Sequence, residues 1–213
     1  MEINSQYSEE NIRKNCPHCD SKHEAMQDVL EETSNFWIVC DHSPLTVGHI
    51  LIIPKKHLSC VGEYSKNLMK EFEGLYNKVS KFINSNFGSV STFEHGIVGQ
   101  TVFHSHFHLL PFNGPPSKIV PEGDSYLERS GGISSLPDVF EKNGKYLFFS
   151  IGKNSWQVSI QLGKPRFFRD RFSLALGNPE RGNWKKMAEN FALMEQVKLE
   201  RNKLIQLWKT DFK

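Results

Sequence analysis

The fold of this 213-residue chain is decided by the stretch Gly99–Pro111, which reads GQTVFHSHFHLLP. Three histidines, His104, His106 and His108, occupy every second position of its middle part. Because successive side chains of a β-strand point to opposite faces, the pattern predicts a strand over 103–111 with the three imidazoles on one face. An imidazole can be a nucleophile, a metal ligand or a proton carrier near neutral pH. We therefore expect this face to carry chemistry rather than a row of solvated histidines on an edge strand.

The composition is that of an ordinary globular protein with one core, or one core and an appendage. Hydrophobic residues make up 38% of the chain and charged residues 23%, and the net charge of +2 says little about partners. No window approaches the roughly 18 to 20 consecutive apolar residues of a membrane span. Residues 1–14 are polar and lack the apolar segment of a signal peptide, so a cytoplasmic location is expected. All nine histidines lie at or before His108, which places the expected chemistry in the first part of the chain.

The segments before the histidine stretch predict a sheet covered by one helix. Residues 1–15 show no clear period and are expected to form a polar arm. Between residues 65 and 86 the apolar side chains recur at helical spacing, which predicts one long amphipathic helix closed by Gly88. Runs of β-branched and aromatic residues bounded by turn formers predict short strands at 29–30, 36–40, 48–54 and 91–95.

The chain after the stretch changes in character. Residues 113–138 are rich in Gly, Pro and Ser and predict a loop or linker. A hairpin is predicted from 146–151 and 156–160, joined by a turn at 152–155. Two helices are expected to follow, one over 166–176 and one from 184 towards the C-terminus. From residue 164 onward 12 Lys or Arg face 6 Asp or Glu, an excess of +6 that is most simply a solvated helix face. A phosphate-facing or RNA-facing surface is the alternative.

The histidine pattern, followed by two apolar residues, resembles the signature of the histidine triad (HIT) nucleotide hydrolases and transferases. The resemblance covers about residues 14–113, roughly half of the chain. It implies an α+β, HIT-like fold: an antiparallel sheet of about five strands packed on a long helix, with a C-terminal hairpin-plus-helices extension. The implied organisation is a HIT domain at 14–113, a linker or loop at 114–145 and an extension of unknown role at 146–213. Because HIT proteins usually dimerise, the resemblance also implies a homodimer.

A pair of cysteines predicts a metal site. Cys16 and Cys19 are separated by two residues and can bind one zinc ion through their thiolates, but a tetrahedral site needs two more ligands. The sequence offers His57 and His104. Similar relatives complete a structural zinc site with a His after the third strand and the first His of the triad. By this resemblance the zinc ligands are Cys16, Cys19, His57 and His104.

Other interpretations of these residues stay open. His18 or His23 could take the place of His57, and the Lys-Lys-His run that ends at His57 could be only a basic strand end. A thioredoxin-like redox pair is disfavoured because the Cys pair lies near no βαβ unit. Cys40 and Cys60 are better explained as small buried hydrophobic residues.

The resemblance also assigns catalytic roles. His106 would attack the α-phosphorus of a nucleotide and form a nucleotidyl-histidine intermediate, which replaces one difficult displacement by two easier ones. His108 would donate a hydrogen bond to a non-bridging oxygen as charge develops there. Thr101 matches a Ser or Thr that contacts the phosphate or the leaving group. Gly99 and Gln100 belong to the same segment, and Gly99 lets the backbone approach a phosphate closely. Ordinary loop hydrogen bonding is the alternative for Thr101 and Gln100.

Asp41 matches an acidic residue that accepts hydrogen bonds from ribose hydroxyls in many relatives, although an Asp before Ser-Pro is also a common turn former. The segment FEHG at 93–96 departs from the Asn or Gln segment of many relatives. The Arg-rich segments at 166–171 and 179–184 lie outside the usual domain. They could form a helical cap that reaches the active site or a tail that stabilises a dimer.

The sequence therefore predicts a nucleotidyl hydrolase or transferase that acts at the α-phosphate of a nucleotide, such as a dinucleoside polyphosphate or a nucleoside phosphoramidate. Whether water, phosphate or a sugar phosphate resolves the intermediate stays open. The alternative is a non-catalytic nucleotide-binding or RNA-binding factor that uses the basic C-terminal helices. The intact triad argues against this alternative, because binding alone does not need a nucleophile at His106.

Overall fold

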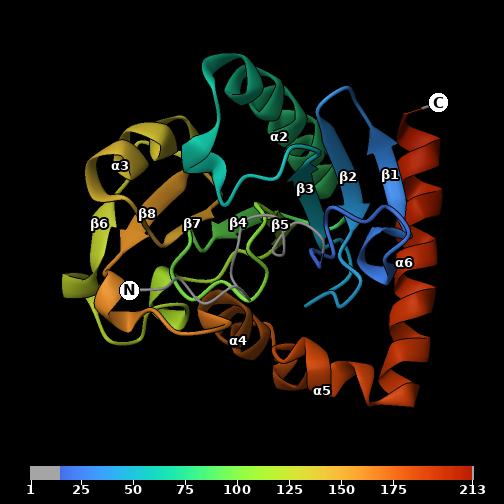
Figure 1. The fold of residues 1–213 in the computed structure, drawn as a ribbon. Helices are drawn as coiled ribbons and strands as arrows, with labels where there is room; N and C mark the ends of the chain where they lie inside the picture. The colour runs from blue at the N-terminus through green and yellow to red at the C-terminus, as the bar shows by residue number, and fades with distance from the viewer. Residues whose placement is uncertain (1–14, 213) are drawn as a thin grey trace, which may run out of the picture.

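The computed structural model describes residues 15–212, which form a mixed α/β fold around one antiparallel sheet (Figure 1). Over these residues the sheet has eight strands in the order β1-β2-β3-β5-β4-β7-β8-β6. The predicted α+β class is confirmed, whereas the number of strands exceeds the expected five. The polar arm expected at residues 1–15 lies outside the described residues except for Asn15. None of the described helices is both long and apolar enough to cross a membrane.

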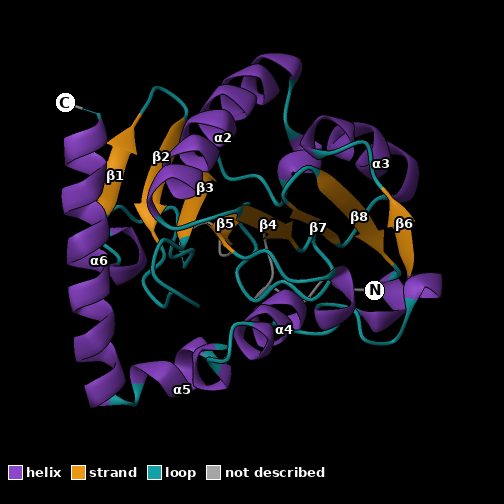
Figure 2. Cartoon of the chain, turned by 180° about the vertical axis from the view of Figure 1, so that it is seen from behind, coloured by secondary structure: helices purple, strands orange, loops and turns teal. Residues whose placement is uncertain are grey.

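Four strands and the long helix form close to the predicted segments, and a fifth strand forms over the second half of the histidine stretch. The strands are β1 (Val29–Glu32), β2 (Phe36–Cys40), β3 (Ile50–Pro54), β4 (Val90–Glu94) and β5 (Phe107–Pro111). Helix α2 (Lys66–Asn86) starts at Ser65, whose hydroxyl accepts a hydrogen bond from the Leu68 amide. Its apolar stripe, which includes Phe72 and Val79, packs on the sheet (Figure 2). Cys40 and Cys60 are buried in this core, which confirms the interpretation of both as small hydrophobic residues.

The C-terminal part continues the same sheet. Strand β7 (Phe148–Ile151) pairs with β4, and β8 (Asn154–Val158) pairs with β7 across a turn at Gly152, which has a φ of 55°. The predicted hairpin is confirmed with a shorter turn than expected. Strand β6 (Leu127–Arg129) adds to the far side of β8. The extension therefore covers the edge that β4 would otherwise expose. The division of the chain at 14–113, 114–145 and 146–213 stays a prediction.

The segment that was expected to be a loop or linker contains regular structure. It holds β6, helix α3 (Leu136–Asn143) and the single turns η4 (Pro116–Lys118), η5 (Asp124–Tyr126) and η6 (Ile133–Ser135). A three-residue strand is too short to show an alternating pattern, so the sequence carries no period that would reveal it. Further single turns of the described chain include η2 (Glu24–Met26), η3 (Val61–Glu63) and η7 (Ile160–Leu162).

The C-terminal helices lie on two sides of the sheet: the first packs on the face opposite α2, whereas the last runs beside β1 and packs against α2 (Figures 1 and 2). They are α4 (Phe167–Ala175), the single turn η8 (Pro179–Arg181), α5 (Trp184–Ala188) and α6 (Phe191–Asp211). Leu109 packs in the core under α2, whereas its neighbour Leu110 packs in a second core with Phe168 and Phe172 of α4. The helix predicted from 184 to the C-terminus is interrupted, because Asn190 caps a new helix by accepting from the Leu193 amide.

The strand predicted over 103–111 is too long, because β5 begins only at Phe107. Just before it, the His104 carbonyl accepts a hydrogen bond from the His106 ring, and the Ser105 amide donates to the Leu58 carbonyl. These backbone groups are therefore not available to a neighbouring strand. As a result the three imidazoles do not form one row on a strand face, and only His108 lies on β5.

Candidate functional site

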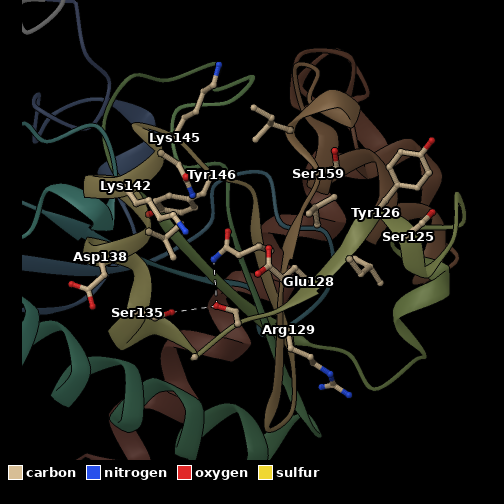
Figure 3. Close-up of a pocket in the computed structure, with 18 residues that line it drawn as sticks. Ser125, Tyr126, Glu128, Arg129, Ser135, Asp138, Lys142, Lys145, Tyr146 and Ser159 are labelled. Carbon is tan, nitrogen blue, oxygen red and sulfur yellow. Dashed lines mark hydrogen bonds between the residues drawn. The ribbon is translucent and has the colours of Figure 1, made fainter.

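The predicted site residues do not line the cavity between the last strands of the sheet and α3. That cavity, of about 730 Å³, lies between β6, α3 and β8, where Figure 3 shows Arg129, Lys142 and Tyr126 around it. Among the described residues that line it there is no histidine or cysteine. It therefore lacks the groups that the predicted nucleophilic or metal chemistry requires.

The triad histidines open instead into a cavity of about 120 Å³, which His106 and His108 line together with Asp41. Arg169 of α4 and Trp184 of α5 close it from the C-terminal side. A second, smaller cavity adjoins it and shares Thr101, His106, His108 and Arg169. The side chains of both halves of the chain thus meet at one place.

The four predicted metal ligands come together beside this cavity. One ligand atom from each of Cys16, Cys19, His57 and His104 lies within 4.8 Å of the others. The Cys19 Sγ atom is 3.2 Å from His57 Nδ1 and 3.4 Å from His104 Nδ1. A turn in which the Cys19 amide donates to the Cys16 carbonyl holds the two thiols on one side.

The donor set fits a zinc ion. With Zn–S near 2.3 Å and Zn–N near 2.0–2.1 Å, a tetrahedral site separates S and N by about 3.6 Å, close to the observed distances. His104 Nε2 lies 2.7 Å from the Pro54 carbonyl oxygen, so the neutral ring carries its proton there and leaves Nδ1 free to bind a metal. The group that the structure assembles includes His57, whereas His18 and His23 are not part of it.

His106 has the geometry of a neutral nucleophile. Its Nδ1 lies 2.6 Å from the His104 carbonyl oxygen, to which it can only donate. The neutral ring therefore keeps its lone pair on Nε2. Burial lowers the pKa of His106, which favours this neutral form near pH 7.

His108 is a hydrogen-bond donor, because a chain of contacts fixes its proton. The Leu45 amide donates to Nδ1 of His49, at 3.1 Å, so a neutral His49 carries its proton on Nε2. That Nε2 lies 2.9 Å from Nδ1 of His108, which must then accept. Burial lowers the pKa of both rings, that of His49 to about 4. The proton of His108 consequently sits on Nε2, and Phe93 holds the ring in place by stacking on it at 4.1 Å.

Asp41 is buried and ion-paired. One carboxylate oxygen lies 2.8 Å from Nη1 of Arg169, and the other accepts a hydrogen bond from the Ser43 amide. Burial by itself raises the pKa of Asp41, but the charge of Arg169 and these hydrogen bonds outweigh it and hold the pKa well below its usual range. Asp41 lines the cavity, as the ribose role requires, yet its charge is already neutralised by α4.

Comparison with known proteins identifies the first half of the chain. The model of the HIT domain matches residues 22–114. A HIT-like protein of Chlamydia trachomatis is 33% identical over 91 residues, which cover 39% of this chain and 78% of that protein. The chain belongs to the HIT family. The family assignment confirms the resemblance on which the sequence predictions rest.

Two further HIT proteins are similar to this chain over part of its length. The adenosine 5'-monophosphoramidase of Schizosaccharomyces pombe is 34% identical over 82 residues, which cover 38% of this chain and 62% of that protein. The crystal structure of a HIT family member from Bacillus subtilis is 31% identical, covers 46% of this chain and 72% of that chain, and superposes with a TM-score of 0.39. With other curated relatives the chain matches about half of their length.

The segment Gly99–Thr101 of the HIT domain borders the smaller cavity. A Cβ atom on Gly99, whose φ is 68°, would lie 2.4 Å from the Lys164 carbonyl oxygen, so only glycine fits there. Gln100 donates from Nε2 to the Ser59 carbonyl, and within the described chain its buried Oε1 has no hydrogen-bond partner. Thr101 is exposed and lines both cavities.

Arg169 lies outside the matched HIT domain and was not named as a site residue, although a helical cap that reaches the active site was one of the two roles offered for 166–171, and Arg169 does line the cavity. It is only 8% exposed, and beyond Asp41 its guanidinium donates to the carbonyls of Ser43, Arg181 and Gly182. The basic excess of the C-terminal part is thus not only a solvated face. The sequence contains one indication that Arg169 faces inward, because it lies one helical turn before the apolar Phe172 and so on the same face of the helix.

Three histidines near the triad were also missed as site residues. His49 sets the proton of His108, and His95 lines the smaller cavity with its Nδ1 2.9 Å from the Val98 carbonyl oxygen. The ring of His18 lies 5.1 Å from that of His106 and borders the larger cavity. No local spacing links these residues to the triad, so the sequence pattern alone did not reveal them.

Proposed function

We propose that this HIT protein is a nucleotidyl hydrolase or nucleotidyltransferase that forms a nucleotidyl intermediate on His106. The observation that carries the proposal is the pair of fixed imidazoles: an Nε2 lone pair on His106 and an Nε2–H donor on His108 border one cavity. The name of the Schizosaccharomyces pombe relative, a monophosphoramidase, supports chemistry at a nucleoside α-phosphate.

In the first step Nε2 of His106 attacks the α-phosphorus and forms an N–P bond. The bond from phosphorus to the leaving group breaks, and the leaving group departs with the electron pair and takes a proton from solvent. The Nε2–H group of His108 donates to a non-bridging oxygen, where negative charge builds up in the transition state. Thr101, Gln100 and Gly99 are the further groups that we assign to substrate binding, and Asp41 to the ribose side.

In the second step an acceptor oxygen attacks the same phosphorus, the N–P bond breaks, and His106 regains its lone pair. With water as acceptor the proton of the water goes to solvent and the product is a nucleoside monophosphate. Phosphate or a sugar phosphate would make the same step a transfer. Cys16, Cys19, His57 and His104 would hold zinc in a structural role, since all four positions of a tetrahedral ion are then filled by protein.

Release of AMP and capture of the intermediate test the proposal. Wild-type protein and the variant His106→Asn are incubated with dinucleoside polyphosphates and AMP amidates, and the quenched protein is examined by mass spectrometry. We expect AMP release and adenylyl-protein with the wild type and neither with His106→Asn. Phe103→Leu, a change at an exposed position of the same loop, is the matched control and should keep both.

The alternative, a non-catalytic nucleotide-binding or RNA-binding factor, would be favoured if wild-type protein releases no AMP and traps no adenylyl group while it still binds AMP. The homodimer and the cytoplasmic location implied by the sequence stay predictions.

A further inference from the structure

Arg166, the residue before α4, is held rigidly against the loop that carries the substrate-binding segment. A Cβ atom on Gly99 would meet the Lys164 carbonyl oxygen at 2.4 Å, and a Cβ atom on Gly163 would meet Cγ1 of Val98 at 2.3 Å. At Gly99 the two backbones are therefore in contact without room for a methyl group, and at Gly163 the backbone packs directly on the Val98 side chain. This contact fixes the position of Arg166 relative to the site.

The backbone of Arg166 is strained. Its φ is 61°, in the left-handed region that a non-glycine residue adopts at a cost of about 1 kcal/mol or more. Glycine would relieve the strain, yet the chain has a long cationic side chain here. Backbone strain of this kind is concentrated at functional positions, so we expect the Arg166 side chain to have a functional role.

The side chain of Arg166 borders the smaller cavity together with Thr101 and His106. Its Nε and Nη2 atoms contact the carboxylate of Asp170, one helical turn later, at 3.2 and 3.5 Å. Within residues 15–212 Asp170 is the hydrogen-bond partner of this guanidinium, so its Nη1 remains for a ligand. The Arg166 side chain is 32% exposed, and a ligand can displace solvent from it without breaking a buried pair.

The neighbouring Arg169 has no guanidinium group available to bind a ligand in this way. Its guanidinium is buried and is already engaged by Asp41 and by backbone carbonyls. Arg166 and Arg169 therefore have different roles: Arg169 forms part of the wall of the site, whereas Arg166 offers its guanidinium to a ligand that enters the site.

We propose that Arg166 binds the phosphate on the leaving-group side of the α-phosphorus, so that the substrates are nucleoside polyphosphates, cleaved at a phosphoric anhydride, rather than phosphoramidates. This inference rests on the proposed function, because it concerns the same site and the same attack by His106. As the P–O bond breaks, negative charge collects on the departing phosphate, and a guanidinium stabilises it by charge-assisted hydrogen bonds. An amine leaving group carries no such charge and gains nothing from Arg166.

A ratio of two substrates tests the assignment. The value of kcat/KM is measured for a dinucleoside tetraphosphate and for an AMP amidate with wild type, Arg166→Gln and Arg166→Lys. We expect the polyphosphate-to-amidate ratio to fall by about 10-fold to 100-fold in Arg166→Gln and to recover in part in Arg166→Lys. Arg171→Gln is the control on the same helix, because Arg171 pairs with Glu122 and lines neither cavity, and its ratio should equal that of the wild type.

An unchanged ratio in Arg166→Gln overturns the inference, and so does an equal loss on both substrates, which is the result of a purely structural role. A binding measurement separates this failure from failure of the proposed function. Calorimetry with ADP and AMP needs no turnover, and the preference of the wild type for ADP should shrink in Arg166→Gln. If the wild type neither releases AMP nor traps an adenylyl group but this preference shrinks, the proposed function is wrong and the phosphate site stands.

Discussion

The two halves of the chain bring opposite kinds of side chain to one cavity. The matched HIT domain supplies imidazoles that burial keeps neutral, at His106 and His108, whereas the C-terminal half supplies the permanent cations Arg166 and Arg169. A neutral imidazole keeps the lone pair that a nucleophile needs, but it offers little charge to a polyanionic substrate. The HIT domain therefore supplies the reactive groups, and the C-terminal half supplies the positive charge that attracts the substrate.

The cysteine pair gives the largest effect expected on the HIT side of this comparison. In the double variant Cys16→Ser, Cys19→Ser we expect zinc to fall from one ion per chain to none and the free energy of unfolding to drop by several kcal/mol. The reason is that the binding free energy of a structural zinc ion, about 10 kcal/mol or more in small domains, is also folding free energy. Metal analysis of the purified protein and urea titration measure both quantities. Cys40→Ala, a buried thiol outside the cluster, should retain the metal, and equal zinc in the double variant would exclude the proposed ligands.

Loss of the nucleophile is the next effect in size. We expect His106→Asn to lower kcat by about 10³-fold or more, because the variant lacks the Nε2 lone pair that attacks the phosphorus, whereas the neighbouring His108 presents an N–H group there. Burial lowers the pKa of His106, so kcat/KM of the wild type should stay level from pH 8 to pH 6.5 and fall only below its ordinary pKa of about 6.5. A rate profile measured from pH 4.5 to pH 8 checks this, and an acid limb already centred above pH 7 would contradict a desolvated nucleophile.

How much of this site the sequence can predict depends on how local each feature is. The triad and the Cys pair are short patterns whose residue types indicate their chemistry. The structure brings the four predicted metal ligands together, but the predicted row of three imidazoles on one strand face is wrong, because the His104 carbonyl binds the His106 ring and the strand starts later. The ion pair of Asp41 with Arg169 joins residues 128 positions apart, and the pairing of β4 with β7 is equally non-local. Neither leaves a pattern in one segment. The short motifs of the HIT half were therefore predictable, whereas the supporting roles of His49 and His95 and the contact of Arg169 with Asp41 were not.

The variant Arg169→Met tests whether the C-terminal half is needed to compensate the buried negative charge of Asp41 in the HIT domain. Removal of one partner of a buried pair leaves the other uncompensated, so Arg169→Met should lower the free energy of unfolding at pH 7 by about 3–5 kcal/mol. Urea titration measures this loss. Arg171→Met, which breaks a more exposed pair with Glu122, should cost about 1 kcal/mol or less.

The pH dependence identifies Asp41 as the partner. The folded pKa of Asp41 is below its usual value of about 3.9, so its pairing contributes stability that is fully present above pH 4 and is lost as the pH falls through the folded pKa. The difference between wild type and Arg169→Met should therefore be largest at neutral pH and shrink below pH 4. If the double variant Asp41→Asn, Arg169→Met is no more stable than Arg169→Met, the cost does not come from an uncompensated carboxylate.

The smallest effect on stability is expected at Glu94 of β4, which lies where the HIT domain contacts the C-terminal half. Its buried carboxyl accepts hydrogen bonds from the Val61 amide and the Ser105 hydroxyl of the HIT domain. It also accepts a hydrogen bond from the Tyr146 hydroxyl of the C-terminal half. Burial raises the pKa of Glu94 to about 7. The folded protein therefore holds this proton more tightly than the unfolded chain, in which the pKa is about 4.3, and stability should fall as the pH rises from about 4.3 to 7.

Glu94→Gln keeps the shape of the protonated acid and removes the titration. We expect the variant to match the wild type at pH 5 and to exceed it by about 2 kcal/mol at pH 8, as measured by urea unfolding at both values. Glu128→Gln, at an exposed position of β6, should follow the wild type at both. Because Ser105 lies between His104 and His106, a variant that is less stable than wild type at pH 8 would mean that the ionised carboxylate is needed to hold the nucleophile loop. The contact between the HIT domain and the C-terminal half would then require an ionised carboxylate at Glu94. The contrast between neutral groups in the HIT domain and charged groups in the C-terminal half would not hold at this residue.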